Sequence, residues 1–115
     1  MIVSHVQDIV GNRPTSSELN NVLRKVLISP KEGWEGYVMR LFELGEEGYS
    51  PKHTHDWPHI NFITGGNGIL HLDGTDYELK EGSFAYVPGG KIHQFRNGGT
   101  EPFTFICIVP EEGDK

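Results

Sequence analysis

The chain has 115 residues and a formal net charge of −6 at pH 7. This length favours one domain over residues 1–115, and the acidic balance argues against a nucleic-acid partner, because such partners recruit basic patches. No apolar run approaches the length of a membrane span, and the N-terminus lacks the pattern of a secretory signal. The single cysteine, Cys107, cannot form an internal disulfide, which predicts a reducing, cytoplasmic environment.

The N-terminal third contains two apolar runs, "IVSHVQDIV" and "VLRKVLI". The second, over residues 22–28, alternates at period two as a strand does. We expect strands within residues 1–30 to cover a sheet edge or to form a dimer contact. Between the runs, "TSSELNN" fits either a short helical turn, with Thr15 and Glu18 spaced as a capping box, or a polar loop.

From residue 37 onward, short runs rich in strand-forming residues alternate with turn signals. The runs are "YVMRLFEL", "HINFIT", "GILHLD", "DYELK", "SFAYVP", "IHQFRN" and "FTFICIV", and they are separated by segments such as "GGN", "DGT", "PGGK" and "NGGTEP". The 15 glycines and 7 prolines supply these turns. Regular spacing of this kind predicts an all-β protein, an antiparallel sandwich or barrel.

The segment "HTHDWPH" holds three of the six histidines, at positions 53, 55 and 59. On a strand His53 and His55 point to the same face, with Thr54 facing away. Pro58 interrupts the ladder, so a turn here returns His59 to the first pair. Neighbouring imidazoles disfavour shared positive charge, and a metal bound to neutral nitrogens resolves the conflict. A His-x-His pair by itself fits equally well two histidines that bind no metal and are either solvated or hydrogen-bonded within the core.

The stretch "GSFAYVPGGKIHQFRN" decides between these interpretations. Its Gly82, Pro88, Gly90, His93 and Asn97 have the spacing of the second motif of the cupin superfamily, which the sequence resembles. Residues 48–66 resemble the first motif of that family in its His-x-His pair, its spacing and its closing glycine, Gly66. This sequence departs from the family twice: the leading glycine, Gly48, comes one position late, and His59 stands where the family has a glutamate.

The resemblance implies the cupin (RmlC-like) fold, an antiparallel β-barrel of the double-stranded β-helix or jelly-roll type. It also implies one divalent transition metal per chain at the barrel mouth, with positions open for water, substrate or dioxygen. The ligands carried over are His53, His55, His59 and His93. The chain is similar to small single-domain cupins with four histidines, whose studied members bind manganese. Imidazole also suits iron, nickel, copper and zinc.

Replacing the glutamate by His59 leaves a ligand set without negative charge. A divalent ion then keeps its full charge, which disfavours the trivalent state and attracts enolates, carboxylates or hydroperoxide. We therefore expect a metal-dependent oxidoreductase of the dioxygenase type acting on a small molecule, and a homodimer. Two alternatives remain: a small-ligand binding or sensing cupin with a structural metal, and a cupin isomerase or lyase.

Several other residues are candidates for the surroundings of the metal, each with an ordinary structural alternative. Phe95 shares the face of His93, and Asn61 shares the face of His59, where it could orient that ring. Phe105 and Cys107 share one face of the last strand; Cys107 lies near the metal or acts as a small buried hydrophobe. Arg40 binds a substrate carboxylate if it faces inward, and Trp57 forms a lid or packs at the rim.

Overall fold

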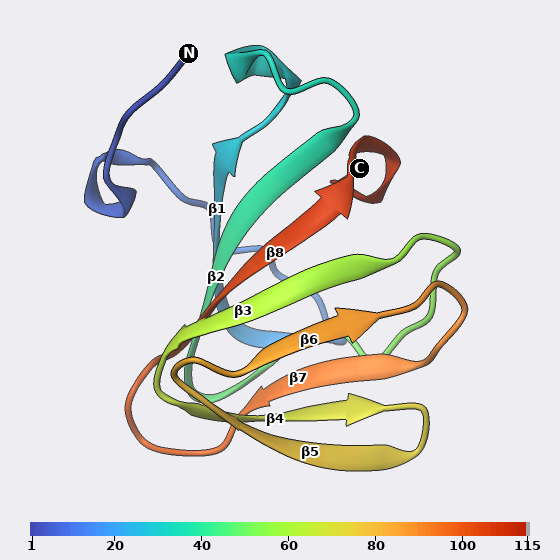
Figure 1. The fold of residues 1–115 in the computed structure, drawn as a ribbon. Coiled ribbons are helices and arrows are strands. Elements are labelled where there is room, and N and C mark those ends of the chain that lie inside the picture. Colours follow the sequence, from blue (N-terminus) through green and yellow to red (C-terminus); the bar gives the residue numbers. More distant parts are fainter. Residues whose placement is uncertain (115) are drawn as a thin grey trace.

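The computed structural model describes residues 1–114, which form an all-β, nearly closed antiparallel barrel (Figure 1). Its elements in chain order are η1 (Val6–Asp8), β1 (Asn20–Ile28), η2 (Pro30–Glu32), β2 (Tyr37–Tyr49), β3 (His59–Gly65), β4 (Asn67–Leu72), β5 (Thr75–Lys80), β6 (Phe84–Val87), β7 (His93–Asn97), β8 (Phe103–Pro110) and η3 (Glu111–Asp114). The three η elements are single 3₁₀ turns, and no helix among residues 1–114 is long and apolar enough to cross a membrane.

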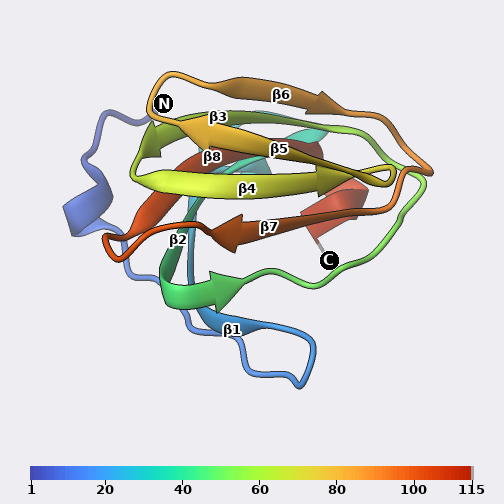
Figure 2. The ribbon, with the colours of Figure 1, turned by 90° about the horizontal axis from the view of Figure 1, so that it is seen from below.

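One sheet makes the barrel, with the strand order β5-β4-β7-β2-β8-β3-β6 and with β1 on the free edge of β2. The sheet curls so strongly that β3 and β5, far apart in this order, come into contact (Figure 2). Strand β2 is long enough to pair with β1, with β8 and, through Tyr49, with Arg96 of β7. The curl therefore brings the start of β7 beside the loop between β2 and β3, which holds His53 and His55 and ends at His59, the first residue of β3.

Along β3 and β8, every second side chain points into the barrel and is buried. In β8, Phe103, Phe105, Cys107 and Val109 are buried, whereas the residues between them are half-exposed. This is the face division that the sequence predicts. The main core cluster consists of Val22, Leu44, Ile63, Leu70, Val87, Phe95, Phe103 and Phe105. Two of its members, Phe95 and Phe105, also line the pocket that the histidines share.

Two glycines of the second motif make the turns that the sequence predicts for them. Gly82 has φ +90° and Gly90 has φ +82°, a left-handed conformation that side chains with a Cβ adopt only with strain. Gly82 lies between β5 and β6. Gly90 lies just before β7, and its N–H donates to the carbonyl of His55 over 2.7 Å. The turn thereby joins the two motifs.

In the N-terminal part, one prediction is wrong and one open alternative is resolved. "IVSHVQDIV" forms no strand: it holds only the turn η1, and Val3 and Val10 are more than nine-tenths exposed. With no sheet face to cover these side chains, period-two alternation does not produce a strand here. Of the two alternatives for "TSSELNN", the polar loop is the one that forms: Ser17 and Glu18 make a turn, and Asn20 and Asn21 begin β1. A capping box forms instead at Ser29 and Glu32 of η2.

Candidate metal centre

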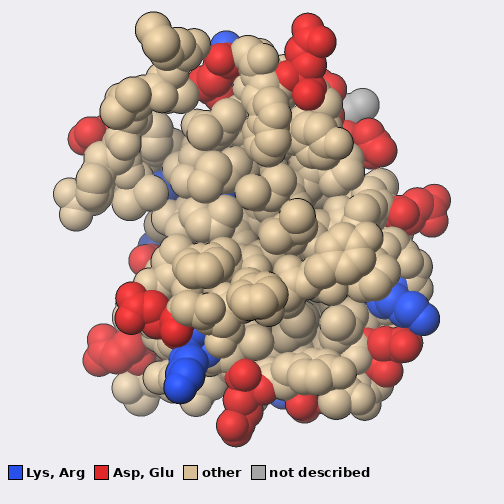
Figure 3. Space-filling model, in the orientation of Figure 1, with Lys and Arg blue, Asp and Glu red and all other residues tan. Residues whose placement is uncertain are grey.

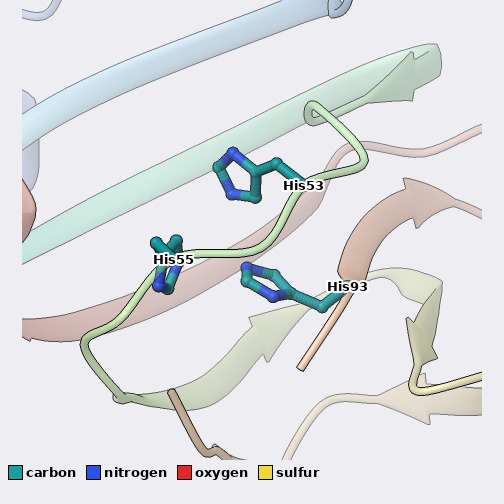
Figure 4. A group of neighbouring side chains, drawn as sticks. All are labelled: His53, His55 and His93. Carbon is teal, nitrogen blue, oxygen red and sulfur yellow. The ribbon is translucent and has the colours of Figure 1, made fainter. Parts of the chain in front are cut away.

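Four histidines from three segments converge at one end of the barrel. His53 and His55 come from the loop before β3, His59 is the first residue of β3, and His93 is the first residue of β7. His53 and His93 are joined by a pair of backbone hydrogen bonds of 3.1 and 2.9 Å. This bridge fixes the first motif against the second, and the side chains of His53, His55 and His93 point toward one another (Figure 4).

The distances suit a shared ion. One ring nitrogen from each of His53, His55 and His93 lies within 4.8 Å of the others, and the described residues thus contain a candidate metal site. The Nε2 atoms of His59 and His93 are 3.2 Å apart, and the ring centroids of His55 and His59 are 5.4 Å apart. His59 therefore adjoins the three-histidine group and completes the set of four that the sequence predicts to lie together.

The outer nitrogens of three rings are held by oxygen atoms. Nδ1 of His55 lies 2.7 Å from the carbonyl of Trp57, Nδ1 of His93 lies 2.9 Å from the carbonyl of Lys91, and Nδ1 of His59 lies 2.5 Å from Oδ1 of Asn61. An oxygen acceptor places the proton of a neutral imidazole on Nδ1, which leaves the lone pair on Nε2. Outer contacts of this kind orient histidine ligands in metal proteins.

This tautomer assignment gives the fit test for a metal. With both Nδ1 atoms protonated, the Nε2 atoms of His59 and His93 present lone pairs to each other across 3.2 Å, with no proton between them. Two nitrogens each ~2.0–2.1 Å from one ion, at ordinary coordination angles, are separated by about 2.9–3.4 Å. The donor set therefore fits a divalent transition metal, with Nε2 atoms as ligands at these two positions.

At neutral pH, protonation does not remove the repulsion between the Nε2 lone pairs of His59 and His93. Burial, partly opposed by the contact with Asn61, lowers the pKa of His59 from 6.5 to about 3. Burial also lowers the pKa of His93 to about 4, and burial together with His55 lowers the pKa of His53. The rings are thus neutral and able to act as ligands, as a metal site requires.

The histidines line one end of a pocket of about 440 Å³. Its wall contains all six of the further candidates from the sequence, namely Arg40, Trp57, Asn61, Phe95, Phe105 and Cys107, together with Phe42, Ser50, Pro51, Thr54 and Gly113. Thr54 is exposed and also contributes to the pocket wall, in a segment between Pro51 and Pro58 that is not a regular strand. Sequence reasoning missed Phe42, although its period-two relation to Arg40 could have indicated it.

Aromatic contacts shape the pocket wall. Phe95 stacks on Phe105 with centroids 4.5 Å apart, and Phe105 stacks on Phe42 at 5.5 Å. The indole of Trp57 lies parallel to the ring of His55 at 4.7 Å, with an interplanar angle of 7°. Trp57 thus packs against a ligand at the rim. The resulting site combines four imidazoles with an apolar, aromatic wall.

Arg40 and Cys107 both face the interior, on adjacent strands. Nη2 of Arg40 lies 3.1 Å from Sγ of Cys107. Burial raises the pKa of the Cys107 thiol above its usual range, although the nearby guanidinium opposes this shift. The thiol is therefore protonated at neutral pH. The inward position of Arg40 resolves the question that the sequence alone left open.

Fold and site together define a barrel protein with a histidine-rich centre at its mouth. The family profile described as "Cupin domain" matches residues 40–109, more than half of the chain. The protein therefore belongs to the cupin family, as the two motifs in the sequence indicate.

Known proteins resemble the chain to different extents. It is 32% identical over 100 residues to the 1-methylthio-D-xylulose 5-phosphate methylsulfurylase of Rhodospirillum rubrum, an alignment that covers 87% of this chain and 63% of the relative. It is 28% identical over 50 residues to the oxalate-binding protein of Thermotoga maritima, covering 44% and 41% of the two chains. The chain thus spans less than two thirds of the length of either relative.

A solved structure gives the same picture. The polyketide cyclase RemF from Streptomyces resistomycificus superposes with a TM-score of 0.88 at 25% identity, covering 96% of this chain and 79% of that one. The similarity extends over nearly all the strands described above. The family and the fold are thereby established, while the relatives' names describe three different activities.

Proposed function

We propose that this cupin is a mononuclear metal-dependent enzyme that oxidises a small organic molecule. The ion is divalent, with manganese as our first choice and iron, nickel, copper or zinc as alternatives, and its ligands are His53, His55, His59 and His93. The observation that carries the proposal is the pair of Nε2 atoms 3.2 Å apart whose rings have their Nδ1 protons held elsewhere. A divalent cation between the two lone pairs would satisfy both nitrogens.

When bound, manganese, iron, nickel or copper would supply Lewis acidity and electron transfer for oxidation by dioxygen or peroxide, whereas zinc would supply Lewis acidity alone. The chain's own residues do the rest. Asn61 orients His59, and Trp57 covers one face of His55. Phe42, Phe95 and Phe105 form an apolar wall that excludes water and favours an aromatic or otherwise unsaturated substrate.

The pocket wall argues against simple acid–base catalysis. Apart from the four histidines, the lining side chains with N–H, O–H or S–H groups are Arg40, Asn61, Trp57, Cys107 and the hydroxyls of Ser50 and Thr54. The described lining residues include no carboxylate, and the Cys107 thiol is protonated. No general base with a pKa near 7 stands beside the ligands. Chemistry centred on the metal follows more directly from these residues.

A second candidate function is cyclisation, isomerisation or bond cleavage without net oxidation. It is favoured by the similarity to proteins named as a polyketide cyclase and a methylsulfurylase. The same metal site would serve it, with the ion acting as a Lewis acid only. A third candidate is a binding or sensing cupin with a structural metal, favoured by the similarity to an oxalate-binding protein.

Oxygen uptake distinguishes these functions. Protein loaded separately with manganese and iron is screened against phenolic, diketone and unsaturated compounds while oxygen consumption and product formation are followed. Oxidation that consumes oxygen and disappears in His93→Ala supports the first function. Product formed without oxygen uptake contradicts it in favour of the second, and tight ligand binding without turnover contradicts it in favour of the third.

A further inference from the structure

The guanidinium of Arg40 is the one cationic side chain that lines the histidine pocket among residues 1–114. We propose that Arg40 is the anion-docking group of this pocket and binds the oxygens of a small organic carboxylate or phosphate. The opposite end of that ligand then reaches the histidines. The inference adds a substrate class to the proposed function. It rests on the proposed function only for the reaction at the histidines, since anion binding by Arg40 does not require a metal.

The hydrogen-bonding capacity of Arg40 is largely unused. Its side chain is 14% exposed, and its Nε atom is buried without a hydrogen-bond partner. Nη2 contacts the sulfur of Cys107, a weak acceptor, and Nη1 lies 3.6 Å from Oδ1 of Asp114, beyond hydrogen-bonding distance. A guanidinium offers five N–H donors in a plane, and their geometry matches the oxygens of a carboxylate or phosphate. Because the buried guanidinium of Arg40 has so few acceptors, it is suited to bind such an anion.

The local charges leave room for an anion. Arg24 and Arg40 share Asp114 as their ion-pair partner, and within residues 1–114 no second carboxylate pairs with either arginine. Among the residues that the structure describes, two cations thus share one carboxylate, and a divalent ion on the histidines would add two further positive charges. Cys107 supplies no compensating thiolate, because burial raises its pKa. An anionic ligand would neutralise this excess.

Asp114 leaves the guanidinium of Arg40 available to a closer acceptor. It belongs to η3, the turn after β8, whose Gly113 lies on the pocket wall against Trp57. Arg24 makes the closer ion pair with Asp114 and holds it at the edge of the pocket, so Arg40 keeps only the long contact. The Asp114 carboxylate therefore competes for Arg40 at longer range than an incoming oxyanion would. Phe42 lies under the guanidinium, 5.0 Å from its centre, and keeps the fork in place.

Calorimetric titration with three matched probes tests the proposal. Benzoate and phenyl phosphate carry different oxyanions on the same ring, and benzamide is a neutral analogue of benzoate. We expect the wild-type protein to bind at least one of the two anions and to bind benzamide much more weakly. Arg40→Gln should weaken anion binding at least about tenfold, the loss expected for hydrogen bonds to a charged group. The preferred anion identifies the ligand as a carboxylate or a phosphate.

Two further variants separate docking from support of the fold. Asp114→Asn should leave anion binding unchanged or strengthen it, because a competitor is removed. If Arg40 only anchored η3 through Asp114, this variant would weaken binding as much as Arg40→Gln, and that result would overturn the proposal. Arg96→Gln removes a half-exposed arginine outside the pocket and serves as the charge-matched control, so it should bind the anions as the wild type does.

Each titration is run on manganese-loaded and on chelator-treated protein. Anion binding that depends on Arg40 in both forms supports the inference even if no metal binds, in which case the proposed function alone fails. Equal anion affinity in wild type and Arg40→Gln, with metal bound normally, overturns the inference and leaves the proposed function standing. Failure of the wild type to bind either anion in either form also overturns it.

Discussion

Asn61 is the residue that determines which nitrogen of His59 faces the centre. It is only 1% exposed, and its Oδ1 lies 2.5 Å from Nδ1 of His59, while its amide nitrogen is 3.5 Å from the carbonyl of Ile106. That second contact orients the amide so that oxygen, not nitrogen, meets the ring. A single amide thus selects the tautomer on which the ligand role of His59 depends.

Removing this acceptor should weaken metal binding. Asn61→Leu deletes the oxygen that holds the Nδ1 proton, and we expect metal affinity to fall roughly 10–100-fold, the usual effect of losing an outer partner of a ligand. Asn61→Asp keeps an acceptor at that position and is the matched control. Metal titration of both variants provides the measurement; equal affinity in Asn61→Leu and wild type would refute the tautomer argument.

The depressed pKa values of His59 and His93 predict how the metal-free protein responds to acid. Both pKa values lie below the unfolded value of 6.5, at about 3 and about 4. Between these limits the unfolded chain binds more protons than the folded one, so stability falls as the pH drops from about 6.5 toward 4. Above about 6.5 these two rings contribute no pH dependence.

Thermal unfolding in chelator over pH 4–7 measures this slope. His59→Gln removes one of the two rings and should flatten the decline in melting temperature, whereas His5→Gln, at an exposed site outside the pocket, should not. The same decline in all three proteins would show that the histidine cluster is not its source.

At the scale of elements, the turn before β7 links the two motifs. The N–H of Gly90 donates to the carbonyl of His55, and the backbone of His93 pairs with that of His53. The first and last parts of the centre are therefore positioned by backbone hydrogen bonds and not by side-chain packing alone. This explains why a glycine at a fixed distance before His93 belongs to the motif.

Gly90→Ala tests that link. A Cβ at this position meets no atom within 4 Å, so the cost comes from the positive φ alone and should be about 1–2 kcal/mol of stability. Gly99→Ala, at a loop glycine without positive φ, is the control and should cost much less. Chemical denaturation measures both; a Gly90→Ala protein as stable as Gly99→Ala would contradict the account of the turn.

Much of this architecture is predictable from the sequence, since alternation and turn residues act locally. The runs from "HINFIT" to "FTFICIV" form the strands expected of them. The extension of β2 through residues 45–49 was not predicted, because its glycines and glutamates disfavour a strand. Tyr49 nevertheless pairs with Asn20 of β1 and Arg96 of β7, beyond a register shift at which Glu47 has φ 60°. The orientation of Arg40 likewise depends on β8 and η3, which lie more than 60 residues away.

The four histidine positions came from motif spacing, and the structure brings them together. The partners of their Nδ1 atoms were only partly foreseeable. Asn61 shares a strand face with His59, so period two reveals it. The carbonyls of Trp57 and Lys91 carry no sequence signal, because every residue has a carbonyl and its direction depends on the turn.

At the scale of the whole molecule, one outer face of the barrel carries few charges. Ile60 and Phe62 of β3 pair with Tyr86 and Phe84 of β6, and all four side chains are between 48% and 79% exposed. In Figure 3 this side of the molecule is uncharged across its centre, with acidic and basic residues at the periphery. Contiguous apolar surfaces of this kind mark interaction sites.

We propose that this face joins two copies of the chain in a homodimer, since two-fold pairing is the commonest oligomeric arrangement. Light scattering at micromolar concentration should give twice the chain mass of 12.9 kDa. Phe62→Glu should produce monomers, whereas Tyr77→Glu, at a similarly exposed aromatic on β5, should not. A monomeric mass for the wild type, or dimers that survive Phe62→Glu, would reject this interface.

The central claim is that four histidines bind one metal ion, and elemental analysis tests it most directly. Untagged protein, purified without chelator and then dialysed against a mixture of manganese, iron, nickel, copper and zinc salts, should carry close to one first-row divalent ion per chain. The His59→Ala and His93→Ala variants, if still folded by circular dichroism, should carry far less. Wild-type protein that retains no metal after this exposure would contradict the account.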